Sequence, residues 1–182
     1  EQSAEEATFF SNRVEKGNSC LKGVIASARP EHDGFEDYLD SIYSPHLKAI
    51  RRVLHVVDDA VSQSTRFREN IAKLASRNLP FDICMLPRQH EFAGLLVDAC
   101  PEVTFILDHC GNPNLSAPEE FAAWSDSLRK LARRPNLYAK LSGIVATAPR
   151  DSVNEDTVFP YLNETLDAFG PTRLVWGSDW PV

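Results

Sequence analysis

Residues 103–113 read VTFILDHCGNP, and this stretch decides the fold. Its first half is a short apolar run with β-branched residues, which is typical of a buried strand. An acid and an imidazole, Asp108 and His109, follow directly, and residues 111–113 then form a turn signal. Functional groups follow the carboxyl ends of strands in parallel sheets, so this stretch indicates a sheet of that kind.

The same unit recurs on both sides of this stretch. We predict six strands, at residues 22–28, 50–57, 81–86, 103–107, 137–145 and 173–176. Helices are predicted at residues 3–16, 35–42, 65–78, 89–100 and 158–169, and from a capping box of Ser116 and Glu119 up to residues 133–135. Strands that alternate with helices and are nearly all apolar indicate a parallel sheet covered by helices.

Two α/β architectures contain such a sheet. A doubly wound sheet would use all six strands, but none of the eight glycines forms a Gly-x-Gly-x-x-Gly motif or a P-loop. A (β/α)₈ barrel has typically ~250 residues, so 182 residues with six strands would form a partial barrel. The residues at the strand ends decide between the two.

Composition restricts the class of protein and its partners. With 43% hydrophobic and 25% charged residues, the chain is expected to be globular. The net charge of −7 repels polyanions, so we expect neither nucleic acid nor an anionic membrane as a partner. The four cysteines form no Cys-x-x-Cys pair, and no apolar run approaches the ~20 residues of a membrane helix. We therefore predict reduced thiols and a cytoplasmic protein.

Polar residues follow the predicted strands, and two clusters stand out among them. In LDHCGNP, His109 follows a buried strand and an acid, which suits a metal ligand or an acid–base group. In WGSDWP, Asp179 lies between two tryptophans, which we expect to exclude water from its carboxylate. An Asx turn before Pro181 is the structural alternative for Asp179.

These clusters resemble the amidohydrolase-related family of metal-optional lactonases and decarboxylases, which includes sugar-lactone and 2-pyrone-4,6-dicarboxylate hydrolases. DHCGNP is followed by PNLYAKLSG and FGPTRLVWGSDWPV in the family's order and spacing, and the upstream IRRVLH and FDICMLPRQH resemble its fourth and fifth strands. The resemblance covers about residues 20–182. It implies a (β/α)₈ TIM barrel of which strands three to eight are present, so residues 1–182 are expected to form a partial domain truncated at both ends.

The resemblance also implies roles for single residues. Asp179 matches the strand-eight aspartate that takes a proton from the attacking water, and His109 matches the strand-six histidine that polarises the substrate carbonyl or binds metal. Arg51 matches an arginine that holds an acidic substrate, although a structural arginine paired with a helix carboxylate is an open alternative. Gln89 lies in a substrate-facing loop. The implied activity is hydrolysis of a lactone or similar cyclic ester, the implied substrate is a small acidic lactone, and the implied cofactor is either a divalent metal such as Zn²⁺ at His109 and Asp179 or none.

One departure from the family keeps other functions open. The family's first strand carries a His-x-His pair, and the five histidines form none. Two ligands fall short of the three that a catalytic zinc site takes from protein, and Lys140 is expected to be an inward or helix-packed lysine, not a bridging ligand. The alternatives are a Zn-dependent decarboxylase on the same barrel and a catalytically incompetent fragment or binding module. Open sheet edges would favour association into a homo-oligomer.

Overall fold

The computed structural model describes residues 3–17 and 20–180. One sheet of six strands has the order β1-β2-β3-β4-β5-β6, and each neighbouring pair is parallel. The strands are β1 (Val24–Ser27), β2 (Leu47–Val53), β3 (Phe81–Cys84), β4 (Phe105–Leu107), β5 (Leu137–Leu141) and β6 (Leu174–Trp176). A doubly wound sheet reverses its strand order part-way, whereas a barrel keeps it sequential. The six strands therefore form an incomplete (β/α)₈ barrel, as predicted.

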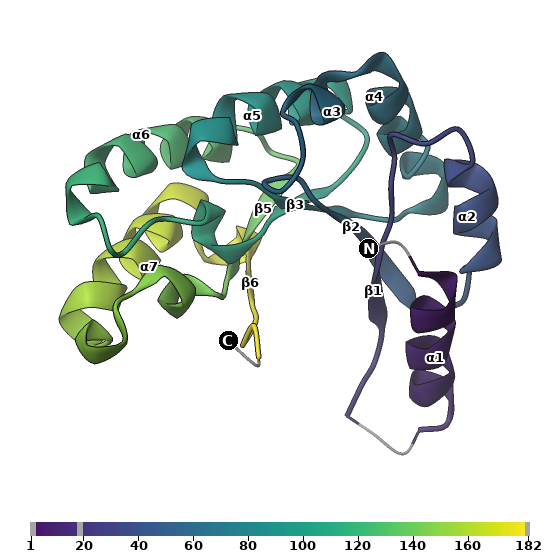
Figure 1. Cartoon of the computed structure of the whole chain (residues 1–182), viewed down its shortest axis with the longest axis horizontal. Helices are drawn as coiled ribbons and strands as arrows, with labels where there is room; N and C mark the ends of the chain where they lie inside the picture. Colours follow the sequence, from purple (N-terminus) through teal and green to yellow (C-terminus); the bar gives the residue numbers. More distant parts are fainter. Residues whose placement is uncertain (1–2, 18–19, 181–182) are drawn as a thin grey trace.

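Helices cover the outside of this sheet. They are α1 (Ala4–Glu15), α2 (Phe35–Ser41), α3 (Ala60–Gln63), α4 (Thr65–Ala72), α5 (His90–Ala99), α6 (Phe121–Ala132) and α7 (Glu155–Phe169). Figure 1 shows them following one another around an arc, with β1 and β6 at its two ends. No helix is seen on the inner side of the arc in this view. Because every neighbouring pair of strands is parallel, the carboxyl ends of the strands lie at the same rim of the sheet.

The predicted strands are right in position but several are too long at their carboxyl ends. Residues 50–57 were predicted as one strand, and β2 runs over Leu47–Val53. Residues 137–145 were predicted as another, and β5 ends at Leu141. The chain leaves β5 at Gly143, whose φ is 60°, and continues as a short 3₁₀ turn over Ile144–Thr147. Apolar loop residues after the strands explain the excess length.

Two of the predicted helix boundaries are wrong. The Ser116–Glu119 capping box does not form: the Ser116 hydroxyl donates to the Thr147 carbonyl oxygen at 2.6 Å, and α6 begins only after a 3₁₀ turn. The helix predicted over residues 65–78 ends at Ala72 and is followed by a separate 3₁₀ turn. The helix predicted over residues 3–16 is confirmed by α1, and Ser3 caps its first turn, with Oγ accepting from the Glu6 N–H at 3.1 Å.

Buried aromatic side chains join the sheet to its helices. The ring of Phe81 in β3 packs edge-on against Phe67 of α4 and Phe105 of β4, with centroid distances of 6.0 and 6.2 Å. All three side chains are fully buried. Burying one phenylalanine contributes roughly 1.5–3 kcal/mol, so this stack fixes the relative position of β3 and β4, which carry site residues.

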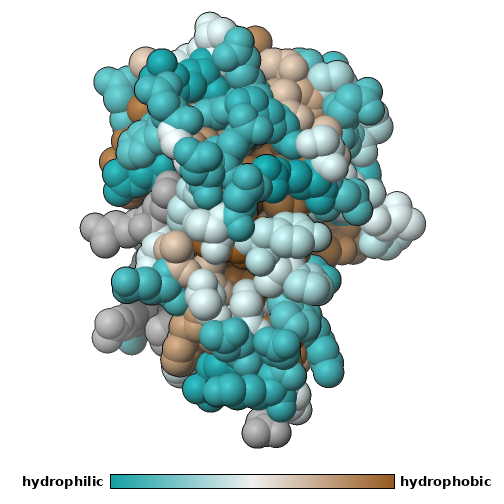
Figure 2. Space-filling model, turned by 90° about the vertical axis from the view of Figure 1, so that its right-hand side faces the viewer, coloured by the Kyte–Doolittle hydropathy of each residue, from teal (hydrophilic) through white to brown (hydrophobic). Residues whose placement is uncertain are grey.

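The two edge strands leave apolar side chains exposed. Ile25 of β1 is 47% exposed and Trp176 of β6 is 80% exposed. Association of copies through these edges stays a prediction. The face on which α1 and α2 lie is mainly hydrophilic, with paler and apolar residues across its middle (Figure 2). Among residues 3–17 and 20–180, no helix has the length and apolar character needed to cross a membrane.

Candidate active site

Four consecutive strands bring charged side chains together near the rim of the arc. Arg51 comes from β2, Asp82 from β3, Asp108 from the end of β4 and Lys140 from β5. Lys140 Nζ lies 2.6 Å from Asp82 Oδ2 and 2.6 Å from Asp108 Oδ1, and both carboxylates are fully buried. Arg51 Nη1 lies 3.9 Å from Asp108 Oδ2. Lys140 thus points inward, as predicted, and holds two carboxylates.

This cluster leaves carboxylate oxygens without donors. Asp82 Oδ1 and Asp108 Oδ2 are buried and have no hydrogen-bond partner within the described part of the chain. Burial and then the neighbouring Asp108 raise the pKa of Asp82 to about 6, against the opposite effect of Lys140. The two carboxylates raise the pKa of Lys140 although burial acts to lower it. Lys140 is therefore a cation at neutral pH.

The loop after β4 holds His109 on a strained backbone. The φ angles of His109, Cys110 and Asn112 are 55°, 54° and 54°, in the left-handed region that costs a non-glycine residue roughly 1–2 kcal/mol. Asn112 Nδ2 donates to the Met85 carbonyl oxygen at 2.8 Å, which offsets part of this cost. Strain of this kind persists only where surrounding structure enforces it, and it concentrates at functional sites.

Helices α5 and α6 anchor this loop from outside the sheet. Trp124 Nε1 donates to the Cys110 carbonyl oxygen at 3.0 Å. His90 Nε2 lies 3.0 Å from the Gly111 carbonyl oxygen, and its Nδ1 lies 2.7 Å from Ser127 Oγ. Burial lowers the pKa of His90 to about 4, so the ring is neutral at neutral pH and carries one N–H. We assign that proton to Nε2, because the Gly111 carbonyl oxygen can only accept, while the Ser127 hydroxyl lies between His90 Nδ1 and the Trp124 carbonyl oxygen, to which it donates at 2.8 Å.

His109 and Asp179 meet over a glycine. His109 Nδ1 lies 2.9 Å from Ser142 Oγ and 3.8 Å from Asp179 Oδ2. A Cβ added at Gly143 would lie 2.5 Å from His109 Nδ1 and 2.8 Å from Asp179 Oδ2. Only glycine lets the two side chains approach so closely at a φ of 60°. The structure therefore brings together the two residues that the sequence singled out.

The tryptophans beside Asp179 do not have the predicted role. Trp176 is 80% exposed and Trp180 is 84% exposed, so the expectation that they exclude water from the Asp179 carboxylate is wrong for this structure. The local turn is made by Ser178, whose Oγ accepts from the Trp180 N–H at 3.2 Å. Pro181, part of the alternative Asx turn, lies outside the described residues. The Asp179 side chain is 27% exposed and open to water.

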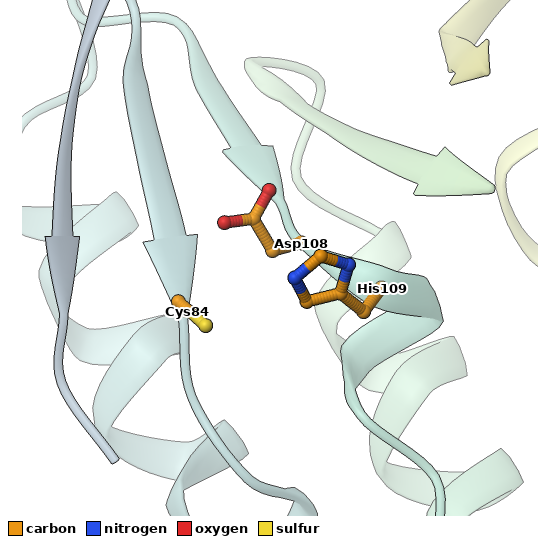
Figure 3. A group of neighbouring side chains, drawn as sticks. All are labelled: Cys84, Asp108 and His109. Atoms are coloured by element: carbon orange, nitrogen blue, oxygen red, sulfur yellow. The ribbon is translucent and has the colours of Figure 1, made fainter. Parts of the chain in front are cut away.

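His109 also belongs to a group of three potential metal ligands, on the side of its ring away from Ser142. Ligand atoms of Cys84, Asp108 and His109 lie within 4.8 Å of one another. In Figure 3 one ring nitrogen of His109 faces Cys84 and Asp108 while the other faces away. Because Nδ1 bonds Ser142, the nitrogen that faces the group is Nε2.

This donor set fits a zinc-type ion. Thiolate sulfur, imidazole nitrogen and carboxylate oxygen are the usual zinc ligands, and Asp108 Oδ2 is a buried acceptor with no hydrogen-bond partner among the described residues. Burial and Asp108 raise the pKa of the Cys84 thiol to about 11, so metal binding there must displace a proton. Sequence reasoning missed Cys84, which was interpreted only as a buried thiol, and gave Asp108 no role.

A family model described as amidohydrolase matches residues 14–182. The chain belongs to the amidohydrolase family. An L-fucono-1,5-lactonase from Burkholderia ambifaria is 31% identical over 140 residues, which cover 76% of this chain and 47% of that protein. An L-fucono-1,5-lactonase from Burkholderia multivorans is 34% identical over 134 residues, with coverage of 69% and 44%.

A solved amidohydrolase from Burkholderia multivorans with bound Zn has a TM-score of 0.88 at 26% identity, over 99% of this chain and 66% of that one. The chain spans about half the length of the curated relatives it matches, 47% and 48% for two of them. The family resemblance carried by DHCGNP and GSDWPV is thus confirmed.

The two predicted substrate-binding residues of this amidohydrolase chain, Arg51 and Gln89, contact other side chains of the chain. The Arg51 side chain is 39% exposed and lies beside Asp108, a carboxylate that directly follows β4 and is not the helix carboxylate considered as its alternative partner. Gln89 is only 1% exposed, and its Nε2 donates to Asp59 Oδ1 at 2.5 Å. Its Oε1 accepts from the Leu86 N–H at 3.0 Å, so Gln89 anchors loops beyond β2 and β3. Substrate contacts by Arg51 and Gln89 stay predictions, and for Gln89 they would require these bonds to break.

Proposed function

We propose that this site hydrolyses a lactone or a similar cyclic ester, with Asp179 as the general base. The observation that carries the proposal is the meeting of His109 and Asp179, 3.8 Å apart, from the ends of two different strands. The carboxylate of Asp179 is partly open to water, from which it would take the proton during attack. The lactonase names of the Burkholderia relatives support this substrate class.

His109 would polarise the carbonyl of the lactone. The buried Ser142 Oγ lies 2.9 Å from His109 Nδ1 and holds the ring in place, and Nε2, the other ring nitrogen, would carry the proton that the carbonyl oxygen accepts. That N–H faces the side of Cys84 and Asp108 (Figure 3), and a carbonyl oxygen placed there would accept its hydrogen bond as water attacks. The strained and anchored loop after β4 fixes this orientation before substrate binds.

Arg51 and a metal ion are the further parts of the proposal. Arg51 is exposed enough to bind the carboxylate of an acidic lactone while it stays beside Asp108. Zn²⁺, if held by Cys84, Asp108 and His109, would take the place of the proton on His109 Nε2 and supply Lewis-acid activation of the carbonyl instead of that N–H. The four cysteines are free and three are buried, which supports a reducing, cytoplasmic location.

Substitution of Asp179 by asparagine tests the general base. General bases contribute typically about 10²-fold or more, so Asp179→Asn should lower kcat by at least that factor on the best substrate from a panel of aldonolactones and pyrone dicarboxylates. Asp167→Asn, the same change at an exposed position of α7, is the matched control and should leave kcat unchanged. If Asp179→Asn keeps kcat within about threefold of the parent, the assigned base is wrong.

Product identification separates the alternatives. A Zn-dependent decarboxylase on the same barrel would release CO₂, whereas lactone opening releases only an acid. An active, monomeric preparation would exclude a catalytically incompetent fragment or binding module. Both alternatives stay predictions from the sequence.

A further inference from the structure

Lys140 occupies the place that a metal ion often takes between carboxylates. Its ammonium lies 2.6 Å from Asp82 and 2.6 Å from Asp108, whose side chains are fully buried, and its own side chain is 16% exposed. Buried carboxylates need a cation because an unpaired buried charge is very costly. The chain supplies this cation from β5.

Asp108 belongs to two groups at once. Its Oδ1 is hydrogen-bonded to Lys140, and its carboxylate is also one of the three donors in the group of Cys84, Asp108 and His109. Its Oδ2 is buried and lacks a hydrogen-bond partner within residues 3–17 and 20–180. Arg51 Nη1 lies 3.9 Å from Oδ2, beyond hydrogen-bonding distance, so this buried acceptor still lacks a donor, which is unusual. Oδ2 is therefore a ready ligand, but it belongs to a carboxylate that already holds an ammonium.

We propose that Lys140 sets the divalent-metal affinity of the Cys84–Asp108–His109 group by competing for Asp108. The ammonium on Oδ1 neutralises the carboxylate and repels a dication that approaches Oδ2, and both effects are strong in a buried site. Asp82 takes part because it is the second carboxylate that holds Lys140 in place. The group binds metal weakly while Lys140 is present and tightly when its charge is removed.

Titration with Co²⁺ tests this competition directly. Co²⁺ replaces Zn²⁺ in such sites, and its thiolate charge-transfer absorption reports a bond to Cys84. Lys140→Met keeps an apolar stem and removes the charge, so Co²⁺ should bind about tenfold or more tightly, equivalent to about 1.4 kcal/mol. Lys140→Arg keeps the charge and should stay within about threefold of the parent. Metal binding is measured without substrate, so its result is distinguishable from a failure of lactone hydrolysis.

Arg51→Met is the matched comparison. It removes the same formal charge from the other side of Asp108, but from a side chain that is 39% exposed and farther away, at 3.9 Å. Solvent screens that charge, so the affinity for Co²⁺ should rise much less than in Lys140→Met. Equal effects of the two substitutions would overturn the specific role of Lys140.

Two further variants test where the metal ion binds and whether Asp82 takes part. Cys84→Ala in the Lys140→Met background should abolish both the tight binding and the charge-transfer band, and tight binding that survives would show that the ion lies elsewhere. Asp82→Asn leaves Asp108 as the remaining carboxylate partner of Lys140, so it should weaken Co²⁺ binding. This variant decides the matter if Lys140→Met does not fold. Unchanged affinity in Lys140→Met, or tighter binding in Asp82→Asn, would overturn the proposal.

Discussion

Replacement of Gly143 by alanine tests whether the close approach of His109 and Asp179 is the working arrangement of the site. The added Cβ would lie 2.5 Å from His109 Nδ1 and 2.8 Å from Asp179 Oδ2. Non-bonded carbon atoms rest at about 3.5–4.0 Å from one another, so the imidazole and the carboxylate must each move by about 1 Å. The substitution thus displaces both proposed catalytic groups without changing either of them.

Two costs are expected, and they can be separated. Alanine in the left-handed region costs about 1–2 kcal/mol of stability. A displacement of about 1 Å at reacting groups lowers the rate about 100-fold. Gly17→Ala is the matched control, because Gly17 has a φ of 67° and no atom of residues 3–17 or 20–180 lies within 4 Å of the Cβ that would be added. It carries the backbone cost alone.

Urea unfolding and lactone kinetics measure the two costs. Both variants should lose about 1–2 kcal/mol in the free energy of unfolding. Only Gly143→Ala should lose activity, with kcat about 100-fold below that of Gly17→Ala. Equal kcat values for the two variants would refute the reasoning, because the displaced pair would then have no part in turnover.

Three further outcomes follow from the packing around the site. His90 has its pKa lowered to about 4 from 6.5, so unfolded chains bind its proton first and stability should fall by about 3 kcal/mol as the pH falls from 6.5 to 4. The raised pKa of Asp82, about 6, makes the free energy of unfolding rise as the pH falls from 6 to 3.8, opposite to the effect of His90. The contribution of His90 is therefore measured by urea unfolding as the difference in pH dependence between the parent and His90→Asn. Trp124→Phe removes the indole bond to the loop of His109 and should lower kcat more than KM changes, as steady-state kinetics will show. Arg173→Met removes bonds to three backbone carbonyls between the last residue of α6 and the first residue of β5, and it should lower the free energy of unfolding by about 2 kcal/mol without a change in kcat.

The strands could be predicted because each buried strand is a short apolar run in the local sequence. Phe105 and Leu107 are both fully buried, and an apolar run of this kind is already visible in the sequence. The ends of strands were harder, because Ile144 continues the apolar run after the chain has left β5. The false capping box had a long-range cause. Ser116 has the residue type of a cap, but Thr147, 31 positions away, binds its hydroxyl instead.

Only those site residues that directly follow a single strand could be predicted from the local sequence. Asp108 and His109 are adjacent in sequence, so their place at the rim followed from the end of one strand. The pairing of His109 with Asp179 followed from the family resemblance. Cys84 could not be found in this way, because its nearness to His109 depends on how β3 and β4 align in the sheet.

The alternation of side chains along each strand indicates which residues face the inside of the arc, although the strands as a whole are apolar. Phe81 and Ile83 in β3 are fully buried under the helices, so Asp82 and Cys84, which alternate with them, face the inside of the arc. Lys140 alternates in the same way with the fully buried Ala139. A charged residue at one of the alternating positions of an otherwise apolar strand, such as Asp82 or Lys140, therefore marks the inner face of a barrel. A buried charge of this kind would destabilise its strand if it had no partner, and the partner comes from a neighbouring strand. The ion pairs of Lys140 with Asp82 and Asp108 could therefore not be predicted from the sequence of any single strand.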